Sequence, residues 1–229
     1  MKKLFKIFVL LFIFASQSLL AEQDISDEAF KAYKKGEKLY QTKKYDEALK
    51  WLKISFDEDQ SKEVAFNLGL TYDELKDYPN AIKWYRKAFE MGNKKGGANL
   101  GLLYKEQKDY PNAIKWYKKA IKKGNVSAIN NLAILYKQQK DYPNAIKWYK
   151  KAIKKGHIDA RKNLGLLFHQ QKDKLNSATY MIGMIGHPYT KERVLGLLRD
   201  DWKIDEPTLK KAYKLQKTLV PNPYTGGID

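Results

Sequence analysis

The chain has 229 residues, of which 43% are hydrophobic and 31% are charged, a composition typical of a soluble globular protein. It contains no cysteine, which excludes disulfide bonds, thiolate metal sites, a cysteine nucleophile and a lipid anchor on an N-terminal cysteine. A formal net charge of +18 favours acidic partners such as nucleic acid, anionic lipid, cell-envelope polymers or acidic proteins, or simply reflects a solvated lysine-rich surface.

Residues 1–21 have the pattern of a secretory signal peptide. Lys2, Lys3 and Lys6 precede an apolar run over Ile7–Ala15, and a polar stretch then leads to the small residue Ala21. The apolar run is too short to span a bilayer. We therefore expect cleavage after Ala21 and a periplasmic or secreted protein, so that nucleic acid is not an expected partner. An uncleaved anchor is the alternative, because leucine is a poor residue two positions before a cleavage site.

A repeated phrase dominates the rest of the chain. The motif DYPNA begins at Asp77, Asp109 and Asp141, a period of 32 residues, and Asp173 falls at the next interval. A second phrase, beginning Asn-Leu, recurs with the same period upstream of each motif. Repetition at 20 to 50 residues predicts a solenoid, in which each repeat is one supersecondary unit.

Each repeat contains two segments with helical periodicity. In the DYPNA segment, Asp109 is placed to cap a helix, Pro111 falls in its first turn, and Gly124 is suited to end it. The upstream segment has leucine and tyrosine on one face, and the short turn KQQKD predicts that the two helices run antiparallel. Gly96 and Gly97 are expected to weaken the start of one upstream helix, at about 1 kcal/mol each relative to alanine.

A single helix pair has too small a core to be stable alone, so neighbouring pairs must stack, with tryptophan and tyrosine between them. We predict a helical repeat solenoid over residues 22–219, with about six repeats of which the first and the last two are degenerate. Residues 220–229 are too rich in proline and glycine to be helical and predict a flexible tail.

The phrase NLGLLYKEQKDYPNAIKWYKKAI, over Asn99–Ile121, resembles a tetratricopeptide repeat. The joins KKGNVSAINNLA and KKGHIDARKNLG instead resemble the related Sel-one-like repeats. The period of 32 is shorter than the tetratricopeptide unit, and the longer glycine-rich turn of Sel-one-like repeats is missing. The resemblance implies an all-α, right-handed superhelical solenoid of antiparallel helix pairs. It also implies a non-catalytic scaffold that binds a protein or peptide in a concave groove lined by the first helices.

The candidate groove residues lie on those first helices. One asparagine per repeat precedes the Leu-Gly or Leu-Ala pair, and its amide suits the main chain of an extended peptide. The alternative is a structural role within the helix pairs. Lys105, Lys137 and His169 follow on the same faces and would give the groove basic character after Asp73. The asparagines of this ladder are Asn67, Asn99, Asn131 and Asn163.

Neither a metal site nor a catalytic site is predicted. His157, His169 and His187 lie on different elements, and no helical pair of ligands or catalytic motif accompanies them. We therefore expect no enzyme activity and no cofactor. The second hypothesis is a basic binder of anionic envelope polymers, acting through the lysines of the second helices. The third, a β-lactam or peptidoglycan-related enzyme, is implied only by some cysteine-rich Sel-one-like proteins.

Overall fold

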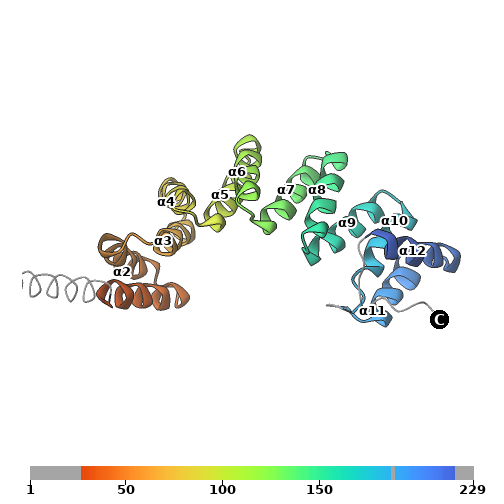
Figure 1. Cartoon of the computed structure of the whole chain (residues 1–229), viewed down its shortest axis with the longest axis horizontal. Coiled ribbons are helices and arrows are strands. Elements are labelled where there is room, and N and C mark those ends of the chain that lie inside the picture. Colours follow the sequence, from red (N-terminus) through yellow and green to blue (C-terminus); the bar gives the residue numbers. More distant parts are fainter. Residues whose placement is uncertain (1–26, 187–188, 220–229) are drawn as a thin grey trace, which may run out of the picture. The chain divides into compact units, whose positions relative to one another are not determined.

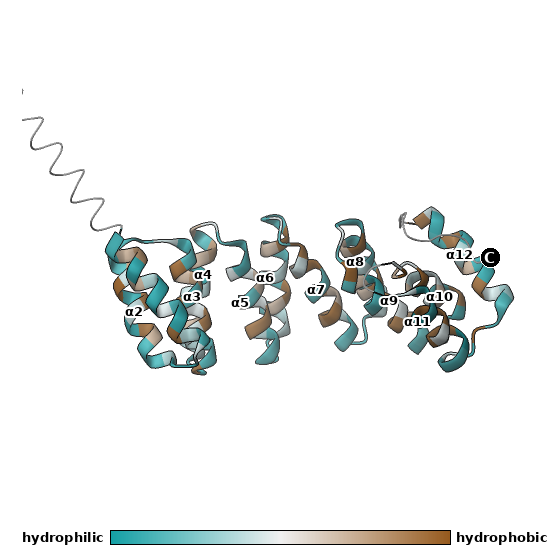
Figure 2. Ribbon diagram, turned by 90° about the horizontal axis from the view of Figure 1, so that it is seen from below, coloured by the Kyte–Doolittle hydropathy of each residue, from teal (hydrophilic) through white to brown (hydrophobic). Residues whose placement is uncertain are grey.

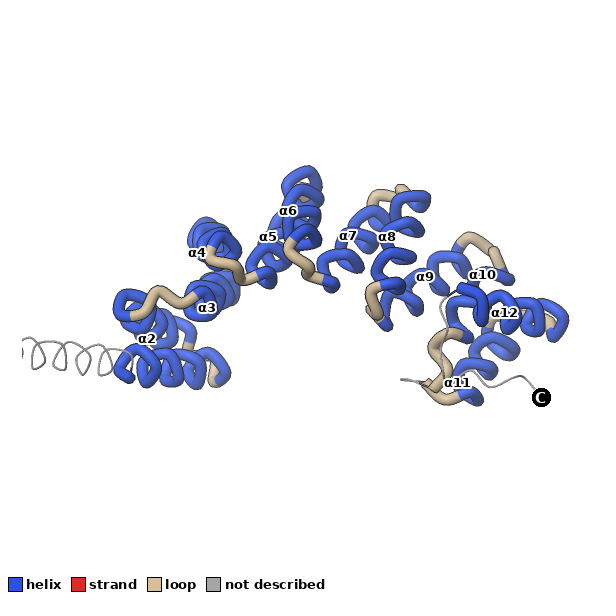
Figure 3. Tube along the Cα trace, in the orientation of Figure 1, coloured by secondary structure: helices blue, strands red, loops and turns tan. Residues whose placement is uncertain are grey.

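The computed structural model describes residues 27–186 and 189–219. The predicted signal peptide, its cleavage site, His187 and the C-terminal tail lie outside these ranges, so those assignments stay predictions. The described chain is helical, with tight turns between helices and no strand (Figure 3). An isolated bridge between Ile185 and Tyr189 is the only β-type pairing recorded for the described residues.

The described residues divide into two compact halves, one that ends at Gln107 and one that begins at Lys108. In the first half, consecutive helices from α2 to α5 pack against each other, and α3 also contacts α5 (Figure 1). The helices of this half are residues 27–41, α2 (Tyr45–Glu58), α3 (Lys62–Glu74), α4 (Tyr78–Glu90) and α5 (Lys94–Glu106).

The second half begins with regular pairs and ends irregularly. Its last helix, α12, packs against α10, and α11 continues into the π-helical turn η1. The helices of this half are α6 (Tyr110–Lys122), α7 (Val126–Gln138), α8 (Tyr142–Lys154), α9 (Ile158–Gln170), α10 (Lys174–Ile182), α11 (Lys191–Gly196), η1 (Leu197–Asp201) and α12 (Glu206–Leu219). The all-helical repeat fold predicted from the sequence is confirmed. Below, "first helices" means residues 27–41, α3, α5, α7 and α9, and "second helices" means α2, α4, α6, α8 and α10.

The DYPNA motif closes the start of a second helix. Oδ1 of Asp141 accepts a hydrogen bond from the backbone N–H of Asn144, and Nδ2 of Asn144 donates to Oδ2 of Asp141 at 2.7 Å. The pair satisfies a backbone donor that would otherwise have no partner in the first turn. The same two bonds recur at Asp77, Asp109 and Asp173, so the predicted cap is confirmed.

Both turns of a repeat need a residue at positive φ. Gly92, Gly124 and Gly156 end second helices at φ of 102°, 79° and 81°, as the sequence predicts for Gly124. In the turns that follow the first helices, this position is held by lysines whose φ lies between 60° and 62°. A lysine rarely adopts this conformation, so a positive φ at these positions was not predicted from the sequence. These lysines are Lys43, Lys76, Lys108, Lys140 and Lys172.

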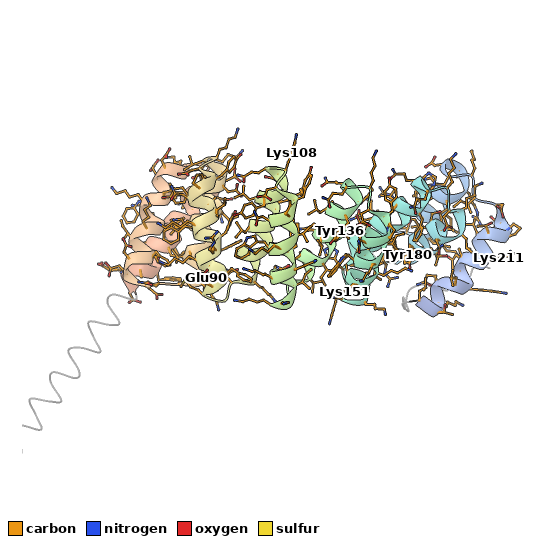
Figure 4. All side chains as sticks on the ribbon, turned by 90° about the horizontal axis from the view of Figure 1, so that it is seen from above. Glu90, Lys108, Tyr136, Lys151, Tyr180 and Lys211 are labelled. Atoms are coloured by element: carbon orange, nitrogen blue, oxygen red, sulfur yellow. The ribbon has the colours of Figure 1, made fainter. Side chains whose placement is uncertain are left out.

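The core is built from tyrosine more than from tryptophan. Tyr85, Tyr117 and Tyr149 are fully buried at the same position of successive second helices. Trp148 is only half-buried, and Nζ of Lys151 lies 4.7 Å from the centre of its ring. In Figure 2 the apolar residues lie mainly where helices face each other, and in Figure 4 Lys151 points away from its helix pair. Lysines of the second helices thus lie over the tryptophan rings, as they do at Lys119 on Trp116 and Lys151 on Trp148.

Candidate functional site

The predicted asparagine ladder is largely engaged inside the protein. Nδ2 of Asn67 donates to the hydroxyl of Tyr33 at 3.1 Å, and Nδ2 of Asn163 donates to Oδ1 of Asn130 at 3.2 Å. Both bonds join neighbouring first helices. Asn131 differs, because it is half-buried on α7 and its side chain forms no hydrogen bond to a described residue. Asn67 and Asn163 therefore link neighbouring repeats, which differs from the expected structural role within one helix pair. The side chain of Asn131 forms no such link.

Asn99 belongs to a small polar network in the first half. Its Nδ2 donates to the hydroxyl of Tyr85 at 3.4 Å, and that hydroxyl donates to Oδ2 of Asp73 at 3.0 Å. Burial raises the pKa of Tyr85 far above its ordinary value, and the negative charge of Asp73 raises it further, so the phenol keeps its proton and acts as the donor. The network fixes Asp73 at the surface of α3.

The other predicted groove residues do not form one cluster. Lys105 lies in the last turn of α5 in the first half and Lys137 in the last turn of α7 in the second, and each side chain is half-buried. Neither forms an ion pair with a described residue. His169 is exposed, and its ring stacks on that of Trp202 with centroids 3.9 Å apart and planes 13° apart. One face of the imidazole is therefore covered by the protein itself.

A feature that the sequence analysis missed is an open cavity in the first half. Its volume is ≈ 190 Å³, and it lies between the helix of residues 27–41, α2 and α3. Asn67 is one of its lining residues, so one of the residues predicted to line a peptide-binding groove does border a cavity. Its lining residues are Glu37, Tyr40, Gln41, Leu52, Asn67 and Leu70.

Further carboxylates and a second tyrosine lie close to Tyr40, one of the residues that line the cavity. The hydroxyl of Tyr45 donates to Oε2 of Glu74 at 3.3 Å, and the rings of Tyr40 and Tyr45 lie 5.5 Å apart. Partial burial raises the pKa of Tyr40, and the charge of nearby Glu74 adds to the rise. The pKa of Asp73 is also raised, first by burial. None of the ion pairs between described residues involves Asp73 or Glu74.

Three family models match separate parts of the chain. Tetratricopeptide repeat models match residues 63–92, 98–122 and 126–155, and a Sel1 repeat model matches residues 20–59. The chain belongs to the tetratricopeptide and Sel1 group of helical repeat proteins. Both halves of the predicted resemblance are thus confirmed, and repeat proteins of this group generally mediate protein–protein interactions without catalysis.

Solved structures agree on the fold of this repeat protein. The structure entitled "Functional Characterization of Pseudomonas Aeruginosa pilF" has a TM-score of 0.62 and 18% identity, and the match covers 87% of this chain and 93% of that one. A Sel1 repeat protein from Oxalobacter formigenes has a TM-score of 0.53 and 23% identity over 82% of this chain and 87% of its own. MamA from Desulfovibrio magneticus RS-1 has a TM-score of 0.55 and 18% identity, and the match covers 76% of this chain and 96% of that one. Comparison with curated proteins finds no relative.

Two further features of the described residues bear on function. They contain no group of three histidine, cysteine, aspartate or glutamate side chains placed to hold a metal ion. Among the helices of residues 27–186 and 189–219, none combines the length and the apolar character that a membrane span requires.

Proposed function

We propose that this chain is a non-catalytic scaffold of the cell envelope that binds a protein or peptide along the surface of its first helices. The general role of tetratricopeptide and Sel1 repeats in protein–protein interaction supports the binding part of this proposal. The signal-like residues 1–21 support the envelope part, because Lys2, Lys3 and Lys6 precede an apolar run of the length found in secretory signals.

The observation that carries the proposal is the contrast between the two surfaces. The second helices α6 and α8 have identical sequences, so their exposed lysines present the same charge twice. The last turns of the first helices change from Asp73 to Lys105, Lys137 and His169. Only a surface that changes along the chain can distinguish one partner from another.

Asn131 gives this surface a residue that can bind a main chain. It is half-buried on α7, and its side chain forms no hydrogen bond to a described residue, unlike the side chains of the other members of the ladder. An asparagine amide offers one donor group and one acceptor, which matches the two groups of an extended peptide. Asn131 is therefore the best candidate for a direct contact with the partner.

A second candidate function is the binding of anionic envelope polymers. Residues 108–219 contain 25 lysine and arginine residues against 9 aspartate and glutamate residues, whereas residues 27–107 contain 16 against 14. The excess positive charge is thus concentrated in the second half. Attraction of this kind is screened by salt, so it is strong at low ionic strength and weak at physiological ionic strength and above.

The experiment is capture from an envelope extract by the immobilised full chain at low and high salt, with mass-spectrometric identification. A protein that the wild type retains at high salt and that Asn131→Ala loses supports the proposed function. A matched control is Asn144→Ala, which changes an asparagine of a helix cap on α8 instead. Capture that disappears at high salt and with Lys118→Glu and Lys150→Glu, but survives Asn131→Ala, would replace the proposal by polymer binding.

The envelope part has its own measurement. Intact mass of the protein recovered from the culture medium or the periplasm should correspond to a chain that begins at Glu22. Protein found only in the cytosol, with residues 1–21 still present, would contradict the envelope assignment and leave the binding role to be judged by the capture experiment.

A further inference from the structure

The cavity in the first half exists because one repeat position is occupied by leucine. Successive second helices place a tyrosine directly after tryptophan, in Trp84-Tyr85, Trp116-Tyr117 and Trp148-Tyr149, but α2 has Leu52 after Trp51. The packing confirms that Leu52 and Tyr85 are equivalent. A Cβ atom added to Gly36 would lie 2.8 Å from Cγ of Leu52, and one added to Gly69 would lie 2.5 Å from Cδ1 of Tyr85.

The missing phenol explains where the space lies. The hydroxyl of Tyr85 reaches Asp73, twelve residues earlier in the chain. The residue twelve before Leu52 is Tyr40, which lines the cavity together with Leu52. The cavity therefore occupies the place where a tyrosine ring would lie in a regular repeat. All of its lining residues except Leu52 lie on first helices.

The size of the cavity limits what it can hold. Its ≈ 190 Å³ is below the range of about 300–1,000 Å³ that is usual for sites of drug-sized molecules and cofactors. Leu52 is fully buried and forms an apolar floor, and Leu70 adds an apolar wall. A single long side chain with an apolar stem fits such a space better than a free metabolite does.

The polar groups at the mouth of the cavity define the charge of the occupant. Glu37 lines it, and its only ion pair among the described residues is with exposed Lys34 at 3.0 Å, a type of surface pair that contributes little. Glu74 lies against Tyr40 and Tyr45 and has no ion-pair partner in the described part of the chain. Carboxylates beside the faces of tyrosine rings attract a cation by charge and by cation–π interaction.

We infer that this cavity binds a lysine or arginine side chain of a partner peptide, with the stem against Leu52 and Leu70 and the cationic group between Glu37, Glu74 and the ring of Tyr40. The inference rests on the proposed function, which it deepens by naming the chemistry of one subsite. Asn67 extends the subsite, since its Oδ1 is an acceptor for a backbone N–H of the same peptide while its Nδ2 holds Tyr33.

Charge favours this occupant over other side chains. The protein as a whole carries a formal +18, so a cationic peptide is repelled by most of its surface and is attracted only where carboxylates gather. The 27–107 segment is nearly balanced in charge, and the carboxylates around the cavity lie within it. An acidic or apolar peptide gains nothing from Glu37 and Glu74, so the subsite selects for a basic residue.

The test uses two peptides that differ only in charge, acetyl-Ala-Ala-Lys-Ala-Ala-amide and the same peptide with norleucine in place of lysine. Each is titrated into the isotopically labelled full chain, and amide chemical shifts report weak binding. The lysine peptide should shift the amides of Tyr40, Gln41, Asn67 and Leu70, and the norleucine peptide should bind at least about tenfold more weakly, since charge-assisted hydrogen bonds are lost. Equal binding of both peptides, or shifts only elsewhere, overturns the inference.

Two variants test the subsite independently of each other. Leu52→Tyr fills the cavity with the residue that regular repeats place there, and it should abolish binding of the lysine peptide. Glu37→Gln combined with Glu74→Gln keeps the volume and removes the charge, and it should weaken binding about tenfold or more. Glu58→Gln, an exposed carboxylate at the end of α2, is the control and should leave binding unchanged. Normal lysine-peptide binding by both test variants contradicts the assignment.

The same variants separate this inference from the proposed function. If the wild type captures a partner at high salt and Leu52→Tyr captures it equally well, the proposed function stands and the cavity is not its basic-residue subsite. If no partner is captured, the proposed function fails while the peptide titration still decides the chemistry of the cavity. Concentration-dependent self-association that Leu52→Tyr abolishes would assign the cavity to a lysine of a second copy and overturn its assignment to a separate peptide.

Discussion

The hydroxyl of Tyr85 on α4 donates a hydrogen bond to Oδ2 of Asp73 on α3 at 3.0 Å and accepts one from Asn99 on α5 at 3.4 Å. One phenol thus ties three consecutive helices of the first half together. Tyr149 occupies the equivalent position of α8, is also buried, and forms no such bond with a described residue. The two tyrosines therefore separate the contribution of the hydroxyl from that of the ring.

Tyr85→Phe should destabilise the protein by about 1–2 kcal/mol, because Asp73 and Asn99 both lose a partner in a partly buried site. Tyr149→Phe, which removes a hydroxyl without a recorded bond, should change stability by less than about 0.5 kcal/mol. Urea unfolding of the two variants, followed by circular dichroism, measures the difference. Equal losses would show that the hydrogen bonds of Tyr85 contribute nothing specific.

Asp73 should make part of the stability depend on pH. Burial raises its pKa above the ordinary 3.8 and Glu74 adds to the rise, against the lowering effect of the hydrogen bond from Tyr85. The folded state therefore holds this proton more tightly than the unfolded state does. The contribution of the Asp73 carboxyl to the stability of the fold is therefore fully present below about pH 4, and it is lost as the pH rises through the pKa of the folded state.

Asp73→Asn removes this titration and can still accept the bond from Tyr85. The stability of the variant relative to the wild type should therefore increase as the pH is raised from about 4 to 7, with the other carboxylates cancelling in the comparison. Unfolding curves at several pH values measure it. A difference that stays constant across this range would mean that the pKa of Asp73 is the same in the folded and unfolded states.

Lys140 provides a test of the turns that end the first helices. It has a φ of 61°, its backbone N–H donates to the carbonyl of Lys137, and that of Asp141 donates to the carbonyl of Tyr136 at 2.9 Å. Glycine adopts this conformation without the steric cost that a side chain incurs. Lys140→Gly should stabilise the protein by about 0.5–1 kcal/mol.

The matched control is Lys147→Gly, in the middle of α8, which should cost about 1 kcal/mol because glycine has a low helix propensity. Thermal melts of both variants are sufficient to show opposite signs. A loss of stability in both would indicate that the side chain of Lys140 contributes more than its backbone strain costs.

His157 is a weak cap among good ones. At the starts of α5 and α7, Oδ1 of Asn93 accepts from the backbone N–H of Lys95 at 3.0 Å, and Oδ1 of Asn125 accepts from that of Ala128 at 2.9 Å. His157, at the start of α9, makes no side-chain cap bond. His157→Asn should therefore stabilise the protein by about 0.5–1 kcal/mol, and Asn125→Ala should cost about 1 kcal/mol. Calorimetric melting of both variants measures this, and a histidine variant no more stable than the wild type would refute the cap argument.

The regular parts of the repeat were predictable because their causes are local. The cap at Asp109 and the end of the helix at Gly124 depend on residues within a few positions, and both were predicted correctly. The roles of the asparagines were not predictable. Asn67, Asn99 and Asn163 occupy the same place in the sequence pattern, yet they bond to Tyr33, Tyr85 and Asn130, whose identities depend on the helices packed beside them.

The sequence did contain a signal for the cavity. The phrase KWL, which ends at Leu52, differs from the phrase KWY, which ends at Tyr85. Aligning the first repeat with the next three shows leucine at the position where those repeats have a buried tyrosine. The sequence alone does not show that this leucine leaves a hollow. The structure shows it, because Gly36 and Tyr40 lie beside Leu52 and do not fill the space, as a larger neighbour would have done.

Gly96 is the position where local and tertiary arguments give opposite answers. Helix propensity alone predicts that alanine at this place in α5 would be better by about 1 kcal/mol. In the structure, a Cβ atom on Gly96 would lie 2.6 Å from the carbonyl oxygen of Tyr85 and 3.1 Å from the nitrogen of Phe89. Both are backbone atoms of α4, so α5 cannot accept a methyl group without moving away from α4.

We therefore expect Gly96→Ala to destabilise the protein by about 1 kcal/mol or more, since overpacking of this kind costs about 1–3 kcal/mol and outweighs the gain in propensity. The equivalent positions of the second half are Ala128 and Ala160, which are fully buried as alanines, so the intolerance is specific to the contact between α4 and α5. The reverse changes Ala128→Gly and Ala160→Gly should each lose stability as well, through propensity and lost contacts. Chemical unfolding of the three variants decides the point, and a Gly96→Ala protein more stable than the wild type would restore the purely local prediction.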